Sequence, residues 1–463
     1  AFAMSGVRDQ SHPVMKDYHK EIETILSSGS LGKAEELVNE KEFIEYLKED
    51  AMDLIPVATK YLNERTQQEN VCVFNFAELL LYYMAMYGNP KEVLLGLLGQ
   101  VETSGDDVTF QTLLTPLQRT LENIPNLKKE SFEWALSTIC RYLIVKPLPS
   151  QYHFEGEERK LYELDCNFVE ISAILEKHVL FLNPFVQSNA LKSRMVTDKA
   201  QAAGIRRTLV NHILHIFDRP LVFLDLSSDL KTSVRETSET YIKFLSALLS
   251  DFCKLFPEIE KVDSKKCDLS KISQTPTNLN EDLGPSNLAY GTLYYLVIAE
   301  QLEFDYIPCV YSNVYIFHEI CSAVISLLRR VEDCAVHKGL LLGLALINRL
   351  CDGVMTTSML ELEVHSDLTA ALINITVFNP LKEYRQLSVK MLDEYIKKFN
   401  NHGKYQLFCN LLNTNIQSCV LGYLVDRVRQ TICYSLKDNT VNPFFLRKKF
   451  VCLGSIMSQV TEC

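Results

Sequence analysis

The chain has 463 residues, of which 67 are Leu, 17 are Gly and 15 are Pro. So few turn-forming residues argue against an all-β sandwich or barrel, and 47% hydrophobic with 23% charged residues excludes a disordered or collagen-like chain. The 47 basic residues face 58 acidic ones, giving a net charge of −11 without a concentrated basic stripe, which argues against nucleic acid as a partner.

The N-terminal segment Ala1–Asp9 lacks the apolar stretch of a signal peptide. The longest strongly apolar run, Gly339–Ile347, is much shorter than the ~18 residues that cross a membrane. We therefore expect a soluble, cytoplasmic protein without a membrane partner.

Two Asn-Pro pairs predict helix starts. Asn89-Pro90 precedes an apolar run, and Asn379-Pro380 precedes an amphipathic one. An Asn side chain can cap the first turn, and Pro in the first helical position has no amide hydrogen to leave unsatisfied. Both pairs are therefore expected to cap helices.

Three segments repeat apolar residues at steps of three and four, which predicts helices that bury one face. They are Thr232–Phe252, Cys309–Arg330 and Leu381–Phe399. In the first, we expect Arg235 to lie on the solvated face. In the second, Val310 is expected to begin the buried stripe.

A blurred repeat joins these helices. Arg235, Lys338 and Arg385 fit one position of a HEAT-type template, and they are 103 and 47 residues apart. HEAT and armadillo units span about 40–47 residues, so the first interval equals about two units. The pattern favours an all-α fold, an α-solenoid of HEAT/armadillo-like helical hairpins, with a non-repetitive helical bundle as the alternative.

One polar stretch divides the predicted helices. Residues 257–286 contain few large apolar side chains and are expected to form a mobile loop. This places N-terminal helical repeats in residues 1–256 and C-terminal repeats, expected to be incomplete, in residues 287–463.

Catalytic and metal-binding patterns are weak. The sequence contains neither G-x-S-x-G nor H-E-x-x-H, and Gly29–Ala34 lacks the spacing of a phosphate-binding loop. His212 and His215 could share a metal, but a polar stripe with Thr208 and Arg219 favours a solvated helix face. We expect no catalytic, cofactor-binding or metal residues and no cofactor, and the protein-binding residues stay unknown.

The 14 cysteines include no C-x-x-C pair, which argues against a zinc site. Most are expected to be small buried hydrophobes in a reducing compartment. Cys321 lies one turn after His318 but belongs to an apolar stripe, so a core thiol is favoured over a ligand. Gly339 and Gly343 are expected to let two repeat helices approach closely.

Several collinear stretches resemble the glomulin and aberrant-lateral-root-formation family of HEAT-like proteins. The most specific block is Met391–Thr414, and the resemblance extends in the same order from about Asn89 to Thr414. The other matching stretches are Asn89–Leu98, Leu113–Gln118, Ala135–Thr138, Leu288–Tyr290 with Leu296, Val297 and Ile307-Pro308, and Lys338–Leu340.

The resemblance implies a non-enzymatic inhibitor of cullin-RING ubiquitin ligases. Such proteins bind the RING-box subunit and cover the surface that receives the ubiquitin-conjugating enzyme, and an immunophilin is a further implied partner. A generic HEAT-type scaffold or adaptor with an unrelated protein partner is the alternative.

The C-terminal end departs from the family pattern. In the family, the RING-box-binding surface lies in C-terminal repeats that continue well beyond the Met391–Thr414 block, whereas this chain continues for only 49 residues. We therefore expect a C-terminally truncated member, with weak or absent inhibition by residues 1–463. No RING-box contact residue is assigned.

Overall fold

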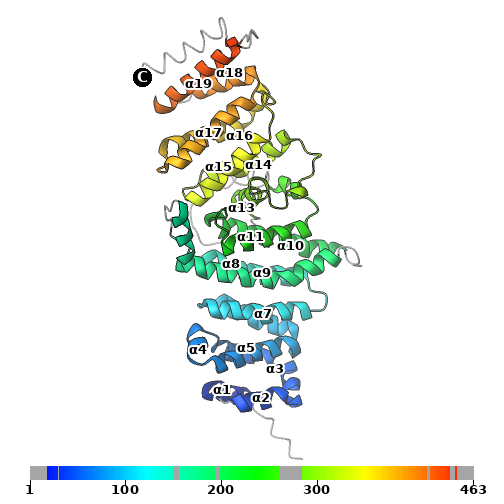
Figure 1. The fold of residues 1–463 in the computed structure, drawn as a ribbon. Coiled ribbons are helices and arrows are strands. Elements are labelled where there is room, and N and C mark those ends of the chain that lie inside the picture. The colour runs from blue at the N-terminus through cyan, green and yellow to red at the C-terminus, as the bar shows by residue number, and fades with distance from the viewer. Residues whose placement is uncertain are drawn as a thin grey trace, which may run out of the picture. The chain divides into compact units, whose positions relative to one another are not determined.

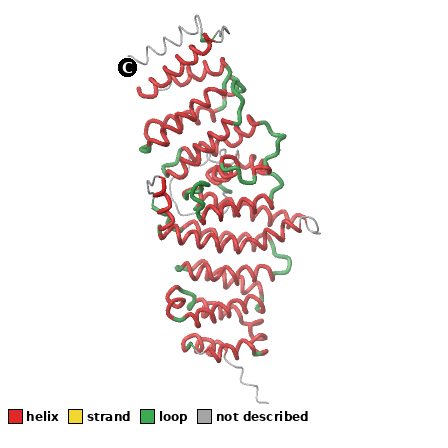
Figure 2. Tube along the Cα trace, in the orientation of Figure 1, coloured by secondary structure: helices red, strands yellow, loops and turns green. Residues whose placement is uncertain are grey.

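The computed structural model describes residues 18–29, 31–150, 156–192, 199–259, 284–413, 418–437 and 444–445. These residues form helices joined by turns and loops, without a strand among them, apart from one isolated bridge between Met355 and Phe399. The predicted all-α, solenoid-type fold class is confirmed (Figure 2).

Contacts divide the chain into two compact units, residues 1–142 and 143–463. Most of the predicted 257–286 loop lies outside the described residues, so the division at that loop stays a prediction. At its ends, the chain is helical at residues 257–259, and Ser286 caps a helix through a bond from the amide of Leu288.

The first unit stacks short helices in layers (Figure 1). Helix α3 packs against α5 and α6, and both of these pack against α7. The helices are α1 (Tyr18–Ser28), α2 (Leu31–Asn39), α3 (Lys41–Thr59), α4 (Glu64–Glu69), α5 (Val71–Tyr87), α6 (Pro90–Thr103), α7 (Asp107–Asn123) and α8 (Lys129–Val145), the last of which ends in the second unit.

The second unit contains longer helices and several single turns. Its helices are α9 (Cys166–Lys192), α10 (Lys199–Asp218), α11 (Ser233–Leu248), α13 (Asn287–Tyr294), α14 (Asn313–Leu328), α15 (Asp333–Asn348), α16 (Glu363–Phe378), α17 (Lys382–Lys398), α18 (Asn401–Asn413) and α19 (Ser418–Lys437). Its 3₁₀ segments are η1 (Gly156–Leu164), η2 (Leu221–Phe223), η3 (Phe252–Leu255), η5 (Phe304–Tyr306) and η6 (Thr357–Glu361), and the π-helical turn η4 (Tyr295–Ala299) continues α13.

Helix pairs make the layers of this unit. Helix α14 packs against α15, and α16 packs against α17. Contacts of α14 with α16 and of α15 with α17 join these pairs, while α13 and η4 lie against α10, α14 and α15 with every side chain from Ala289 to Ile298 buried. Neighbour-to-neighbour packing of this kind is how helical repeats share one core.

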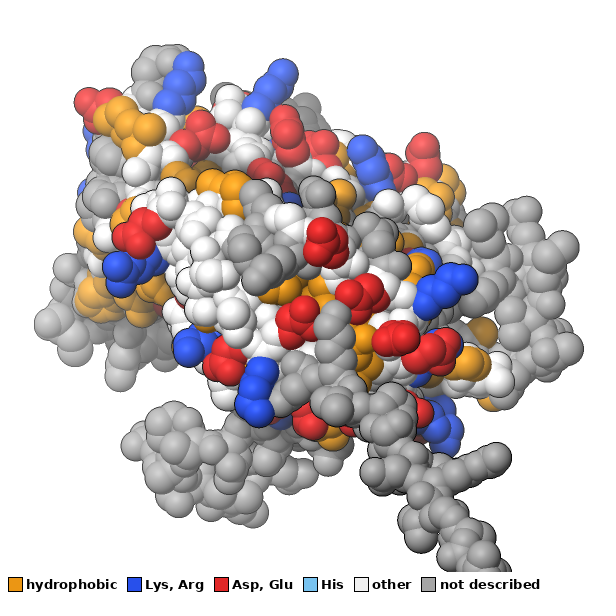
Figure 3. Space-filling view, turned by 90° about the horizontal axis from the view of Figure 1, so that it is seen from below, with side chains coloured by type: hydrophobic (Ala, Val, Ile, Leu, Met, Phe, Trp, Pro, Cys, Tyr) orange, Lys and Arg blue, Asp and Glu red, His pale blue; other side chains and the backbone are white. Residues whose placement is uncertain are grey.

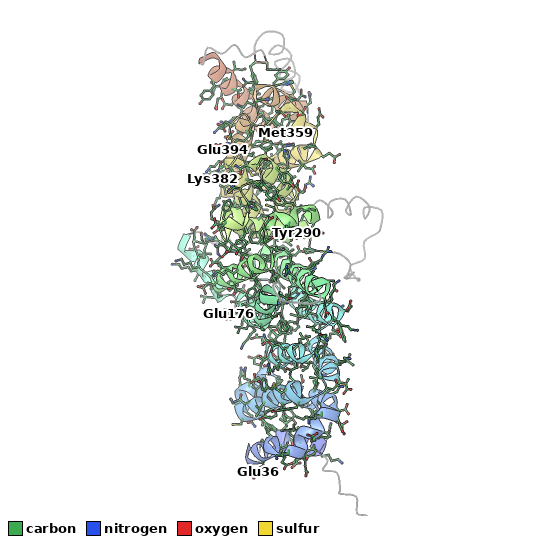
Figure 4. All side chains as sticks on the ribbon, turned by 90° about the vertical axis from the view of Figure 1, so that its right-hand side faces the viewer. Glu36, Glu176, Tyr290, Met359, Lys382 and Glu394 are labelled. Atoms are coloured by element: carbon green, nitrogen blue, oxygen red, sulfur yellow. The ribbon has the colours of Figure 1, made fainter. Side chains whose placement is uncertain are left out.

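Helix α17 shows how the sequence pattern becomes a layer. Its buried residues Ser388, Leu392 and Tyr395 follow steps of four and three, as the periodicity of Leu381–Phe399 predicted. Lys382 and Glu394 lie at the edge of the stack in Figure 4, where a charged side chain keeps its hydration.

Two boundary predictions are wrong. Val310 lies before α14 and is 84% exposed, so the buried stripe of that helix begins later, at Ile316. Asn379 does not cap α17, because its side chain accepts a bond from the amide of Leu381 in the loop and the helix begins at Lys382. By contrast, Asn89 caps α6 and Pro90 is its first residue, as predicted.

The two glycines of α15 lie at close helix contacts, which confirms the prediction for the Gly-x-x-x-Gly pair. A β-carbon at position 339 would lie 2.9 Å from the Cβ of Leu327 in α14. At position 343 it would lie 2.1 Å from the Cε of Met391 in α17. The first neighbour is fixed to the backbone, whereas the second is the end of a flexible side chain.

This difference predicts unequal effects of two alanine substitutions. Gly339→Ala is expected to lower the free energy of unfolding by roughly 1–3 kcal/mol, because α14 and α15 must move apart. Gly343→Ala is expected to cost less than about 1 kcal/mol, because Met391 can turn away and Ala favours the helix by about 1 kcal/mol over Gly. Urea unfolding of both variants measures the difference, and equal losses would contradict this account.

No helix in the described part of the chain is both long enough and apolar enough to cross a membrane.

Candidate functional site

The residues between α10 and α11 cross the second unit without forming a long helix. Leu221, Val222, Leu224 and Leu226 of this stretch are at most 1% exposed. Apart from the single turn η2, their carbonyl groups lack helical partners, and a buried carbonyl without a hydrogen bond is costly. The segment Leu221–Ser227, here named the crossing segment, therefore needs donors from other elements.

Two buried cations supply these donors. Lys338 of α15 is 2% exposed, and its Nζ donates to the carbonyl oxygens of Val222 at 2.8 Å and Leu224 at 2.5 Å. Arg235 of α11 is 4% exposed and donates to the carbonyl oxygen of Leu226 at 2.5 Å. Cationic donors make stronger hydrogen bonds than neutral ones, so the crossing segment is firmly held between α11 and α15.

Arg235 also forms the most buried ion-pair network among the described residues. Its guanidinium lies 2.8 Å from Glu300 and 3.0 Å from Glu239, and Glu300 is only 10% exposed. The hydroxyl of Tyr295 donates to the other oxygen of Glu300. Burial alone lowers the pKa of Arg235, but hydrogen bonds and charge from Glu239 and Glu300 raise it overall.

The third cation comes from η1. Arg159 donates through one nitrogen to Asp225 at 2.5 Å and to the hydroxyl of Ser227 at 2.8 Å. Burial tends to raise the pKa of Asp225, but the bonds from Arg159 and from the amide of Ser227 lower it overall. Asp225 is therefore a carboxylate paired with a guanidinium. We name Asp225 and Ser227, together with the side chains of α15 and α17 next to them, the polar junction.

Side chains of α15 and α17 complete the polar junction. The rings of His337 and Tyr384 stack with centroids 5.5 Å apart. Burial lowers the pKa of His337 and raises the pKa of the Cys334 thiol, while it lowers the pKa of Lys338 to about 8. A nucleophilic cysteine needs a lowered pKa, so this arrangement favours structural anchoring and guanidinium binding over covalent catalysis.

The position of Arg235 corrects a prediction. The helical pattern placed it on the solvated face of α11, but Glu300, which follows 65 residues later, draws it into the core. Arg385, which the HEAT-type template aligns with Arg235 and Lys338, donates to main-chain carbonyls as well, those of Asn379 and Pro380 just before its own helix.

A second prediction, the solvated face of α10, is wrong. Thr208 is 7% exposed and His212 is 4% exposed. The Nε2 atoms of His212 and His178 are 2.8 Å apart, and the Nδ1 of His178 is 2.6 Å from the hydroxyl of Tyr241. His212 is buried beside His178 of α9, which in turn meets Tyr241 of α11. The Oγ1 of Thr208 is buried without a hydrogen bond to the described residues, whereas His215 and Arg219 are partly exposed.

Cysteine burial also differs from the expectation. Of the ten cysteines whose side chains the structure describes, four are buried, one is partly buried and five are exposed, and all ten are free thiols. Cys321 is 1% exposed, in agreement with the predicted core thiol. Within the described ranges, no group of three or more His, Cys, Asp or Glu side chains is arranged to hold a metal.

The first unit has a shallow acidic hollow between α1 and α2. It is lined by Lys20, Glu21, Thr24, Ile25, Glu36, Leu37 and Glu40. Figure 3, seen from below relative to Figure 1, shows acidic side chains gathered on this face.

Comparisons with known proteins extend over nearly the whole chain. A family model described as "Uncharacterised protein family, YAP/Alf4/glomulin" matches residues 37–451. Glomulin of Mus musculus is 25% identical over 450 residues, which cover 94% of this chain and 70% of the mouse protein. Glomulin of Homo sapiens is 26% identical over 383 residues, which cover 81% of this chain and 61% of the human protein.

Proposed function

Because this chain belongs to the YAP/Alf4/glomulin family, we propose that it is a non-enzymatic regulator that inhibits cullin-RING ubiquitin ligases. It would bind the RING-box subunit and block access of the ubiquitin-conjugating enzyme. The observation that carries the proposal is the family match over residues 37–451, which includes the strongest block of resemblance, Met391–Thr414.

The stacked helices suit such a mechanism. A protein that covers the enzyme's docking surface lowers the enzyme's apparent affinity by mass action, without any chemical step. Binding is tighter when the surface is already ordered, because less conformational entropy is lost. Lys338 and Arg235 support this by fixing the crossing segment against α15 and α11.

The test is a pull-down with a purified RING-box–cullin complex, combined with a ubiquitin-chain assay. It uses residues 1–463 beside the longest natural form of the protein, because the chain spans 70% and 61% of the two relatives' lengths. We expect the longest form to bind and to inhibit chain formation, and residues 1–463 to inhibit weakly or not at all.

Three other outcomes are informative. If the longest form neither binds nor inhibits, the proposal is wrong. A separate, unbiased capture of partners that recovers an unrelated protein and no cullin would favour a scaffold or adaptor. Full inhibition by residues 1–463 would place the RING-box-binding surface within this chain. Recovery of an immunophilin in the unbiased capture would support the second implied partner.

A further inference from the structure

The segment η1 is an unusual element. It continues for nine residues as a 3₁₀ helix, whereas 3₁₀ runs longer than three or four residues are uncommon because their hydrogen bonds are poorly aligned. None of its side chains from Glu158 to Leu164 is buried, and Leu161 and Leu164 are 50% and 77% exposed. An element with so little buried surface opens at a low free energy.

One side chain of η1, that of Arg159, nevertheless binds in a site that other segments form. Arg159 is 27% exposed and its partner Asp225 is 20% exposed, so the ion pair is largely shielded from water. The hydroxyl of Ser227, a residue 7% exposed, accepts a second bond from the same nitrogen. The carboxylate of Asp229 also acts electrostatically on the guanidinium. These groups come from the crossing segment and from the residues after it.

A ring contact also joins η1 to α9. The ring of Tyr162 meets Phe168 of α9 edge-on, with centroids 5.1 Å apart. Figure 1 shows η1 leading into the start of α9 and running across the direction of the layered helices. Release of Arg159 would therefore free η1 from the polar junction while α9 keeps its own packing against α11.

We propose that η1 is a strap latched by Arg159, and that its opening frees the Asp225–Ser227 site for an arginine side chain from a partner's peptide. The site already binds a guanidinium, and carboxylate and hydroxyl oxygens are the acceptors that this group prefers. The strap competes with the partner as an intramolecular ligand, whose effective concentration is in the millimolar range. The proposal does not depend on ubiquitin ligase inhibition.

Hydrogen exchange of the whole chain tests the latch. In Arg159→Ala, amides of η1 are expected to exchange about tenfold faster than in the unchanged protein, since two charge-assisted hydrogen bonds are lost. Amides of α9 and α11 keep their protection, which shows that the variant is folded. The matched control Glu163→Ala removes an exposed charge from the same strap and leaves exchange unchanged. Equal exchange in Arg159→Ala and Glu163→Ala would overturn the latch.

A peptide tests the freed site. A fluorescent peptide with the strap sequence GEERKLYEL, used at up to about 1 mM, is expected to bind the Arg159→Ala protein and to slow the exchange of amides around the crossing segment. The same peptide with Arg159→Gln is expected not to bind. Absence of binding to the Arg159→Ala protein, or equal binding of the two peptides, would overturn the proposed arginine site.

Discussion

Lowering the pH from 7 to 5 is expected to remove roughly 4–6 kcal/mol from the free energy of unfolding, through three buried histidines. Burial lowers the pKa of His178 to about 3 and of His365 to about 4, and it lowers the pKa of His212 well below its usual value. In the unfolded chain each titrates near 6.5. Below that pH the unfolded state binds more protons, so stability falls as the pH falls.

The geometry explains why these histidines stay neutral. One consistent arrangement of protons lets His212 donate to His178, His178 donate to the hydroxyl of Tyr241, and Tyr241 donate to the carbonyl of Leu175. His365 has a separate partner, the hydroxyl of Tyr395 at 2.5 Å. An added proton would place a charge on a side chain that is at most 4% exposed, without an acidic partner in either cluster.

Urea unfolding between pH 7 and pH 5 measures the effect. His365→Gln keeps a hydrogen-bonding side chain but cannot titrate, so it is expected to weaken the pH dependence by about 2 kcal/mol over this range. Thr369→Val removes a buried hydroxyl from the same helix and controls for a general loss of stability. An equal pH dependence in His365→Gln and the unchanged protein would contradict the assignment.

Arg235→Met is expected to lower the free energy of unfolding by about 3–5 kcal/mol. The substitution leaves Glu300 as a buried carboxylate without its cation and leaves the carbonyl of Leu226 without a donor. The matched control Lys243→Met removes an exposed cation from the same helix and is expected to cost less than about 0.5 kcal/mol.

A double-substitution cycle separates the stability that the Arg235–Glu300 ion pair contributes from the stability that side-chain packing contributes. Glu300→Gln in the Arg235→Met background removes the unpaired charge, so the double variant is expected to lose less than the sum of the two single losses. Denaturant unfolding of all four proteins gives the coupling free energy. Additive losses, or an Arg235→Met loss as small as that of Lys243→Met, would show that the ion pair does not hold this region.

The sequence predicts the helices better than it predicts the polar core. Apolar spacing placed α11, α14 and α17 within a few residues of their observed bounds, because helix burial has a local period. The close helix contacts at the glycine pair of α15 were equally predictable, since small residues in an apolar helix imply a close neighbour.

The errors share a physical cause. Arg235 is buried because Glu300 lies beside it, although Glu300 is 65 residues away in the chain. In the same way, His212 is buried because His178 lies beside it, 34 residues away in the chain. A stripe of polar residues looks the same whether water or another helix satisfies it. The polar junction could not be predicted from local sequence either, because Arg159 and Asp225 belong to segments without a repeat pattern.

The most direct test of the proposed function is a competition measurement on the RING-box subunit. The longest natural form of the protein is added to a cullin-RING ligase, and the rate of ubiquitin-chain formation is measured as the conjugating enzyme is increased. Steric blocking predicts that enough conjugating enzyme restores the full rate, because both proteins compete for one surface. A rate that stays unaffected by the added protein at every enzyme concentration would contradict the proposal.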